Sequence, residues 1–308
     1  MRALVTGGAG FIGSNLVDRL IDDGHEVVVI DDLFTGFREN VHPKADFVEA
    51  SIADEPAVRD AMVGVDVVFH QAAHKAVLRS VEHPLVTDLA NTHGTLILLK
   101  AALDAGVRRV VQASSSSVYG GADVVPTPES TPLYPRSPYA VTKVAGEHYA
   151  HVFAELYGLE TVRLRYFNVY GPRQRPDSTY AAVIPLFIDA LLSGKAPIVH
   201  GDGGQSRDFT YISDVVDANL AAATAPGDAC SGNAYNVAGG EETTLLELLD
   251  VIGNVLGVAP EPQFTDTRPG DVRRSRGDGS AAARDLGFTT KVPLDEGMRA
   301  TIEWLRNR

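Results

Sequence analysis

A glycine-rich turn near the start of the chain constrains the fold more than any other stretch. Residues 3–6 form a short apolar run, and Gly7, Gly10 and Gly13 follow where a helix is expected to begin, at about Phe11. Glycine lets the backbone turn tightly and approach a phosphate group, and a helix that begins there presents free N–H groups and a positive dipole. A strand, a glycine turn and a helix in this order are typical of a dinucleotide-binding unit.

An acidic residue ends the second expected strand. Residues 27–30 are apolar, and Asp31 follows them, 21 residues after Gly10. A carboxylate at this position can accept hydrogen bonds from the ribose hydroxyls of an adenosine, and it would repel a 2′-phosphate. The sequence therefore predicts NAD, rather than NADP, as the cofactor.

The first half of the chain alternates apolar strands with helical patterns. The strands are expected at 3–6, 27–30, 45–49, 65–70, 109–113 and 161–165, and two long helices at 85–105 and 139–157. This alternation predicts an α/β fold with a Rossmann-type, doubly wound parallel sheet. Ligands bind such sheets at the carboxyl ends of the strands. The expected ligand segments are therefore 7–13, 31–36, 71–80, 114–119 and 166–175.

The pattern changes after residue 165, where prolines interrupt the chain. Helices are expected at 181–193, 213–224, 245–256 and 294–306, and one further strand at 234–237. We expect residues 1–165 to form an NAD-binding Rossmann domain, with 209–237 returning to it. Residues 166–308 are expected to form mainly a smaller mixed α/β domain that binds the substrate.

Composition excludes several classes of function. The net charge of −13 argues against nucleic acid or an anionic membrane as a partner. Cys230 is the single cysteine, so an internal disulfide and a cysteine-rich metal site are excluded, and no histidine spacing predicts a metal site. No apolar run reaches the length of about 18 residues that a membrane span needs. The first strand follows Met1 at once, which leaves no room for a signal peptide, so the expected location is the cytoplasm.

Tyr139 and Lys143 are candidates for the catalytic base. They are four residues apart at the start of an expected helix, so their side chains share one face. A phenol has an ordinary pKa near 10, too high for a base at neutral pH. The Lys143 ammonium and a positive nicotinamide ring are expected to lower this pKa. The spacing alone also fits an ordinary exposed pair, but the glycine turn before it favours catalysis.

A run of serines ends the fifth expected strand, in Ser114-Ser115-Ser116-Ser117. A hydroxyl at this strand end can hydrogen-bond the same substrate oxygen as Tyr139 and hold it in place. The alternative is a turn of small residues in which serine has no catalytic role.

Further motifs carry a resemblance to a known family. They are Thr6-Gly7-Gly8-Ala9-Gly10-Phe11-Ile12-Gly13, Ser115 with Val118-Tyr119-Gly120, Ser137-Pro138-Tyr139 with Lys143, Arg165-Tyr166-Phe167-Asn168-Val169-Tyr170-Gly171-Pro172, Gly201-Asp202-Gly203, Arg207-Asp208-Phe209 and Arg268-Pro269-Gly270-Asp271. Over nearly its whole length the chain resembles the extended short-chain dehydrogenase/reductase family. Within it, the chain is similar to the nucleotide-sugar epimerases of the UDP-glucose 4-epimerase type.

The resemblance implies an activity. Tyr139, assisted by Ser115 and Lys143, would deprotonate the sugar 4-hydroxyl while bound NAD oxidises C4, and the 4-keto sugar would be reduced again on its other face. The expected substrates are UDP-glucose and UDP-galactose, and UDP-GlcNAc and UDP-GalNAc in addition. The resemblance also implies a homodimer that pairs through helices 85–105 and 139–157.

The resemblance carries over binding residues as well. Those implied for NAD are Gly7, Gly10, Phe11, Ile12, Gly13, Asp31, Asp32, Ile52, Ala72, Lys75, Asn91, Tyr139, Lys143 and Tyr166. Those implied for the UDP-sugar are Lys75, Ser115, Tyr139, Asn168, Val183, His200, Arg207, Arg268 and Asp271. Arginine suits this role because its planar fork can bind two diphosphate oxygens. Asn91 could equally be a polar residue on a helix face, and Arg268 could form a surface ion pair.

Two positions depart from the family's pattern. Ser51 stands where the family often has an aspartate that touches adenine. Related dehydratases carry an acid two or three residues before the tyrosine of Val-Tyr-Gly, where this chain has Ser116 and Ser117. Serine cannot act as the acid of that elimination at neutral pH, so the sequence favours an epimerase over a dehydratase.

The identity of the sugar stays open. Ser275 stands where the resemblance implies a wall against the C2 substituent, and a small side chain there leaves room for an N-acetyl group. Arg79 and His74 are expected in a loop that faces the sugar, where Arg79 could bind a uronate carboxylate or pair with Glu82. The alternatives are therefore a UDP-glucuronate 4-epimerase, a nucleotide-sugar dehydratase or reductase, and a non-catalytic NAD-binding sensor.

Overall fold

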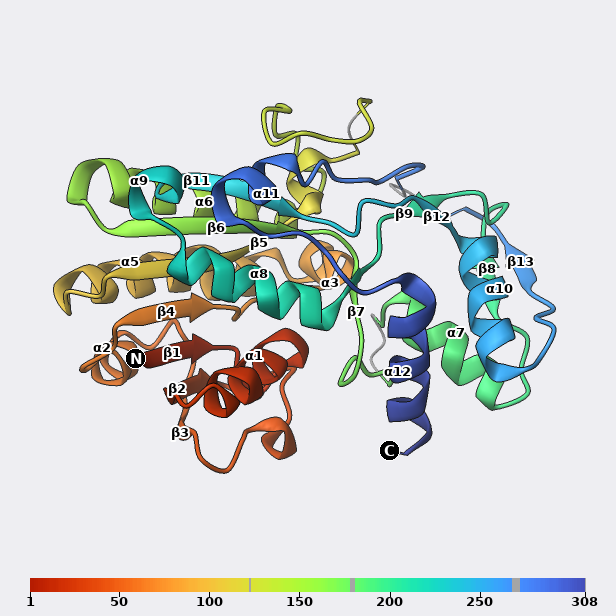
Figure 1. Cartoon of the computed structure of the whole chain (residues 1–308), viewed down its shortest axis with the longest axis horizontal. Coiled ribbons are helices and arrows are strands. Elements are labelled where there is room, and N and C mark those ends of the chain that lie inside the picture. Colours follow the sequence, from red (N-terminus) through yellow and green to blue (C-terminus); the bar gives the residue numbers. More distant parts are fainter. Residues whose placement is uncertain (122, 178–180, 268–271, 308) are drawn as a thin grey trace.

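The computed structural model describes residues 1–121, 123–177, 181–267 and 272–307. Its centre is a parallel sheet of seven strands in the order β11-β6-β5-β4-β1-β2-β3 (Figure 1). The strands are β1 (Arg2–Thr6), β2 (Glu26–Asp31), β3 (Asp46–Glu49), β4 (Val67–His70), β5 (Arg109–Ser115), β6 (Glu160–Tyr166) and β11 (Asn233–Val237). The strand order reverses between β1 and β4, which confirms the expected Rossmann-type doubly wound fold.

Helices cover both faces of the sheet. One face packs against α1 (Phe11–Asp22), α8 (Ile212–Thr224) and α11 (Ser280–Leu286), with Leu16 and Val215 in the core. The other face packs against α2 (Glu55–Ala61), α5 (Gly94–Asp104) and α6 (Pro138–Tyr157). Because apolar side chains are needed on both faces, the central strands are nearly continuous apolar runs, as in Val27–Ile30.

Short elements connect the strands with these helices. They are η1 (Arg38–Asn40), α3 (Val77–Glu82), α4 (Pro84–Asp88), η2 (Leu89–His93), η3 (Ser116–Tyr119) and α9 (Gly227–Cys230). The sequence predicts one uninterrupted helix over residues 85–105, and this is wrong in detail. The helix is divided into α4, η2 and α5, and η2 is a π-helical turn that buries Asn91.

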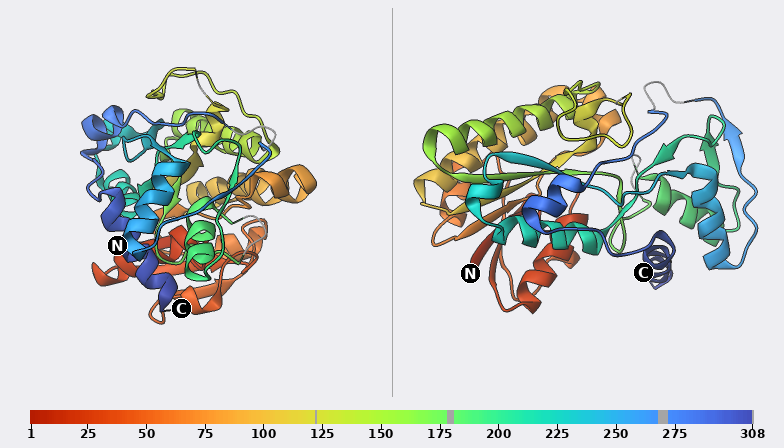
Figure 2. Two further views of the ribbon diagram at one scale, coloured as in Figure 1. Left: turned by 90° about the vertical axis from the view of Figure 1, so that its right-hand side faces the viewer. Right: turned by 45° about the horizontal axis from the view of Figure 1, so that its top comes forward.

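A second unit lies beyond the carboxyl ends of the strands (Figure 2). It contains α7 (Val183–Leu192), α10 (Leu245–Leu256), α12 (Leu294–Arg306) and short strands. The short strands are β7 (Val169–Tyr170), β8 (Ile198–His200), β9 (Ser206–Arg207), β10 (Thr210–Tyr211), β12 (Thr243–Thr244) and β13 (Gln263–Thr265). Phe187, Leu248 and Met298 belong to its own apolar core.

The chain returns from the second unit to the sheet through α8 and β11, and again through α11. Strand β11 pairs with β6 in parallel register, from Asn233 opposite Val162 to Val237 opposite Tyr166. Helix α8, which precedes β11 and the short α9, packs on the same sheet. The division of the chain into domains at residue 165 stays a prediction.

Among the described residues, no helix is both long and apolar enough to cross a membrane. Within the same ranges, no three His, Cys, Asp or Glu side chains come together in a way that could hold a metal ion.

Candidate active site

The glycine turn between β1 and α1 is shaped by close backbone packing. Gly7 has φ +70°, and a Cβ there would lie 2.7 Å from the backbone nitrogen of Ala72. A Cβ on Gly13 would lie 2.1 Å from the carbonyl oxygen of Gly7. Both positions therefore require glycine, and α1 can begin directly at Phe11 with its first N–H groups facing the turn.

Asp31 connects this turn to the end of β2. Its Oδ2 accepts the Ala9 N–H at 3.0 Å, and its Oδ1 accepts the Leu33 N–H at 2.8 Å. Burial raises the pKa of Asp31, while these two backbone donors oppose the change. A carboxylate has about four acceptor sites, so Asp31 can still accept bonds from ribose hydroxyls.

A cleft of about 810 Å³, here called the glycine-turn cleft, opens above these groups. Ten residues that the resemblance implies for the cofactor line it: Gly7, Gly10, Phe11, Ile12, Gly13, Asp31, Asp32, Ile52, Ala72 and Lys75. Ser51, which stands in place of the family's adenine-contacting aspartate, lines it as well. The volume is in the range of cofactor sites.

Arg173 also lines this cleft and provides a test of whether a dinucleotide fits. Its Nη2 forms an ion pair with Asp18 of α1 at 2.6 Å. Its Nη1 is buried and has no hydrogen-bond partner among the described residues. A buried guanidinium N–H beside the first turns of α1 is suited to an oxygen of a diphosphate. The cleft therefore fits NAD, with its diphosphate at the glycine turn.

Arg173 is not among the residues predicted from the sequence, although 166–175 is among the expected ligand segments. The signal that could have found it is the Arg-Gln-Arg run at 173–175, directly after Gly-Pro. Arg173 has φ +73°, a backbone conformation that few residues other than glycine adopt. Such conformations are concentrated at functional sites, but a sequence pattern does not reveal them.

A second cleft of about 600 Å³, here called the tyrosine cleft, adjoins the first. The two share walls formed by Phe11, Ile12, Gln71, Ala73, Lys75, Val77, Asn168 and Gln174. The further polar residues that line the tyrosine cleft include Ser115, Ser116, Tyr139, Lys143, Tyr166, Arg207 and Ser275. All three expected catalytic residues thus line one cleft beside the glycine turn.

Helix α6 presents Tyr139 and Lys143 to this cleft. The helix begins with Pro138, and Ser137 caps it by accepting the Ala140 N–H at 3.1 Å. Lys143 Nζ donates to the Ala113 carbonyl at 2.9 Å, at the end of β5. Tyr139 and Lys143 are both buried.

The protein groups alone do not lower the pKa of Tyr139. Burial raises the pKa of Tyr139 to about 12, although the Ser115 hydroxyl opposes this by hydrogen bonding. Burial also lowers the pKa of Lys143 to about 8, while Glu147 opposes it. The expectation included the positive nicotinamide ring, and the side chains do not achieve the lowering without that charge.

Several predicted site residues lie elsewhere. Asn91 lines neither cleft, because its amide bonds to His74 and Thr142 inside the protein. Val183 begins α7 and packs into the second unit's core. His200 bonds to Thr265 on β13, outside both clefts. The predicted substrate residues Arg268 and Asp271 lie outside the described residues.

The loop after β4 also differs from expectation. Arg79 and His74 line the glycine-turn cleft and not the tyrosine cleft. Both stack on Phe34: the His74 ring lies 3.9 Å from the Phe34 ring centroid, and the Arg79 guanidinium 4.1 Å. These side chains therefore belong to the dinucleotide side of the site.

Known proteins similar to this chain cover its whole length. Residues 3–238 match the model of the NAD dependent epimerase/dehydratase family. The UDP-glucose 4-epimerase of Mycolicibacterium smegmatis is 45% identical over 315 residues, which covers 100% of this chain and 99% of the relative. A solved structure of UDP-glucose 4-epimerase from Thermotoga maritima, with UDP-glucose, has a TM-score of 0.95 at 39% identity and covers 100% of this chain and 99% of that chain. A solved structure of the UDP-N-acetylglucosamine 4-epimerase from Methanobrevibacter ruminantium has a TM-score of 0.95 at 38% identity. The match covers 99% of this chain and 98% of that chain.

Proposed function

The chain belongs to the NAD-dependent epimerase/dehydratase family, and from that premise we propose that it is a UDP-hexose 4-epimerase. It is an enzyme of the isomerase class, and its cofactor is NAD. The proposed substrates are UDP-glucose and UDP-galactose, with UDP-GlcNAc and UDP-GalNAc as further substrates.

One observation carries the proposal. The cleft lined by Ser115, Tyr139 and Lys143 shares walls with the cleft built on the glycine turn. A sugar bound in the first cleft would therefore lie next to a nicotinamide bound in the second. This arrangement supports chemistry in which a proton leaves a sugar hydroxyl while a hydride leaves the carbon atom that carries it.

We assign Tyr139 as the base that removes the proton of the sugar 4-hydroxyl. The Ser115 hydroxyl would hold the same oxygen, and the Lys143 ammonium would stabilise the phenolate that acts as the base. NAD, when bound, supplies a reversible hydride acceptor, so the sugar is oxidised at C4 and reduced again without net change. The Lys143 bond to the Ala113 carbonyl keeps the ammonium beside the phenol during both steps.

Asn168 and Arg207 are our candidates for holding the nucleotide diphosphate. Both line the tyrosine cleft, on the side of the second unit. Arg207 donates to the Val272 carbonyl, which ties it to the segment before Ser275. The small Ser275 side chain at this wall supports room for an N-acetyl group. Arg268 and Asp271 stay predicted contacts.

The serines at 116 and 117 favour epimerisation over dehydration. Both line the tyrosine cleft, and the Ser117 hydroxyl is buried without a partner among the described residues. Neither can supply the proton that a β-elimination needs, since a serine hydroxyl is not acidic near neutral pH. The 4-keto sugar would therefore be reduced rather than dehydrated.

The experiment that tests this function is incubation of the purified protein with UDP-glucose, UDP-GlcNAc and UDP-glucuronate, followed by NMR of the sugar. We expect the C4 epimer of UDP-glucose, and of UDP-GlcNAc. A 4-keto-6-deoxy product would overturn the proposal in favour of a dehydratase. Net consumption of added NADH would identify a reductase, and epimerisation of UDP-glucuronate alone would change the substrate.

We also propose that two copies form a homodimer through α3, α4 and α6. These elements pack side by side and expose large apolar side chains, among them Val81, Leu85 and Val141, which are 52–84% exposed. Pairing with a second copy would remove this apolar surface from water.

A further inference from the structure

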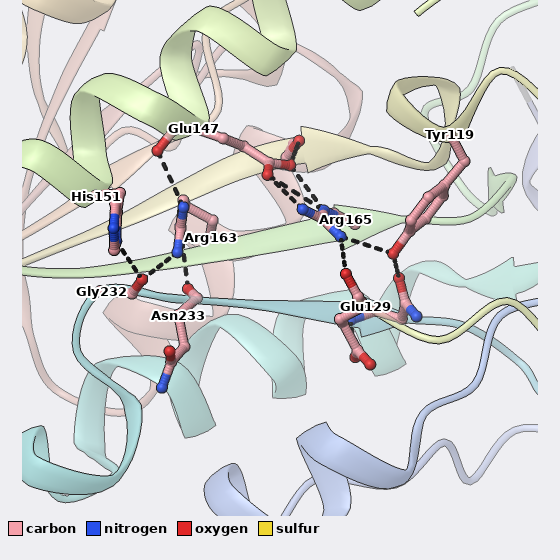
Figure 3. Close-up of polar contacts among 10 residues, drawn as sticks. Tyr119, Glu129, Glu147, His151, Arg163, Arg165, Gly232 and Asn233 are labelled. Atoms are coloured by element: carbon pink, nitrogen blue, oxygen red, sulfur yellow. Dashed lines mark hydrogen bonds and ion pairs between the residues drawn. The ribbon is translucent and has the colours of Figure 1, made fainter. Parts of the chain in front are cut away.

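A buried ion pair lies directly behind the tyrosine cleft. Glu147 of α6 and Arg165 of β6 approach to 2.7 Å, and their side chains are only 2% and 6% exposed. Figure 3 shows the Glu147 carboxylate directed at the guanidinium, which meets it through Nε and Nη2. A charge this deeply buried is costly unless its partners are fixed, so the pair holds α6 and β6 in one arrangement.

The same carboxylate also reaches the end of β5. Ser114 Oγ donates to Glu147 Oε1, and one helical turn earlier Lys143 Nζ donates to the Ala113 carbonyl. Two successive turns of α6 are thus joined to two consecutive residues of β5. Ser115 is the next residue of that strand, so these contacts set how Ser115 and Tyr139 face each other.

The other side of Arg165 is equally constrained. Its Nη1 donates to the Tyr119 hydroxyl at 2.8 Å and to the Glu129 carbonyl at 3.1 Å (Figure 3). Tyr119 lines the tyrosine cleft and donates to Asn236 Oδ1 on β11 at 2.7 Å. Arg165 therefore cannot move away from Glu147 without breaking contacts to the wall of the cleft.

The charges near Lys143 make Glu147 important electrostatically as well. On α6, Glu147 is the anion that acts on Lys143, and Tyr139 is a neutral phenol with a raised pKa. On β4, His70 stays neutral because burial, with a smaller effect of Lys143, lowers its pKa to about 3. On β6, Arg165 and Arg163 are cations that both interact with Glu147.

We propose that Glu147 is a positioning residue for the Tyr139–Lys143 pair: it fixes α6 against β5 through Ser114 and Arg165, and its negative charge keeps Lys143 an ammonium. This inference rests on the proposed function, in which Tyr139 is the base. Glu147 itself does not touch the substrate, since it does not line the tyrosine cleft.

The test compares the wild type with Glu147→Gln, which keeps the shape and removes the charge. An amine-reactive reagent is applied across a range of pH, and the labelling of Lys143 is followed by mass spectrometry. We expect the pKa of Lys143 to fall by about one unit in Glu147→Gln. We also expect kcat for UDP-glucose to fall at least about tenfold, with KM changed less than about twofold, since only the pairing of base and ammonium is affected.

Matched variants separate charge from shape. Glu147→Asp keeps the charge and should retain the wild-type titration of Lys143, with part of kcat rescued. Glu155→Gln removes an exposed carboxylate from the same helix and should change neither quantity. If Glu147→Gln does not fold, Glu147→Gln with Arg165→Met removes both buried charges and the contacts that position α6, and kcat is measured in that protein.

An unchanged Lys143 titration in folded Glu147→Gln would overturn the inference, and so would a wild-type kcat in the double variant. Labelling needs no turnover, so the titration result is distinct from failure of the proposed function. A wild-type protein that epimerises no sugar would refute the function, whereas the labelling would still report on Glu147.

Discussion

The Asn91 side-chain amide donates to Thr142 Oγ1 at 3.0 Å and joins the π-helical turn η2 to the helix that carries Tyr139. Thr142 Oγ1 donates in turn to the Tyr139 carbonyl at 2.8 Å. Asn91 also accepts the His74 N–H at 2.8 Å, so it holds the loop that follows β4. This buried side-chain amide thereby joins the loop that lines the glycine-turn cleft to the helix that lines the tyrosine cleft.

Asn91→Ala should lower the free energy of unfolding by about 1–3 kcal/mol, since buried partners lose their hydrogen bonds. Thr142→Val should lower the free energy of unfolding by less than Asn91→Ala does, because it leaves the hydrogen bond between Asn91 and His74 intact. Urea denaturation measures both changes. Equal stability of the wild type and Asn91→Ala would contradict this role.

Tyr139→Phe should retain NAD and lose at least about 10²-fold in kcat, because only the ionisable oxygen is removed. The measurements are turnover and the NAD released on denaturation. Tyr134→Phe serves as the control, since Tyr134 is 68% exposed and lies outside both clefts. A Tyr139→Phe enzyme with a near-normal rate would refute the assigned base.

Arg173→Met should weaken NAD binding by about tenfold, the equivalent of one charge-assisted hydrogen bond. The fraction of purified protein that carries NAD, and its loss during dialysis, measure this. Arg299→Met is a matched control because Arg299 pairs with Asp295 on the surface of α12. Full NAD content in Arg173→Met would remove Arg173 from the diphosphate site.

His70 should make the protein less stable in acid. Its Nδ1 accepts from Thr6 Oγ1, and its Nε2 donates to Thr95 Oγ1, so the folded state needs the neutral ring. Burial lowers its pKa from 6.5 to about 3. Below pH 6.5 the unfolded chain binds a proton that the folded chain does not bind until about pH 3. Stability therefore falls by about 1.4 kcal/mol per pH unit across this window.

His70→Asn should be less stable at neutral pH but should lose this acid dependence. Denaturation at several pH values measures the slope. His83→Asn, at an exposed position, is the control. A slope in His70→Asn as steep as in the wild type would show that another group causes it.

Leu85→Glu should convert the proposed dimer into a monomer, because Leu85 is 84% exposed on α4 and a charge there opposes burial. Sedimentation at several concentrations measures the mass. Val63→Glu, 71% exposed and away from α3, α4 and α6, should leave the assembly unchanged. A wild-type protein that sediments as a monomer would refute the dimer.

Local spacing made part of this molecule predictable. Gly7, Gly13 and Asp31 act within one strand–turn–helix–strand unit, and Tyr139 and Lys143 share one helical turn, so their meeting needs no distant partner. The Arg-Gln-Arg run at 173–175 points to arginines in this segment, but the position of the Arg173 guanidinium depends on Asp18, which is far away in the sequence. The same holds for the ion pair of Glu147 and Arg165, which depends on how α6 lies on β6.

The burial of Tyr139 and Lys143 could not be predicted from the sequence either. The spacing of Tyr139 and Lys143 predicts attraction between an ammonium and a phenolate, but the sign of the pKa change depends on desolvation of both groups. The division of the helix at η2 was equally hidden, because the residue types over 85–105 do not distinguish a π-helical turn from an α-helical one.

The return of β11 to the sheet affects how the protein is made. Until Val237 has left the ribosome, β6 has no neighbour on one side, and its N–H and C=O groups form an open edge that other chains can pair with. The sheet can be completed only after the first part of the second unit has been synthesised. A nascent chain halted before β11 is therefore expected to need a chaperone.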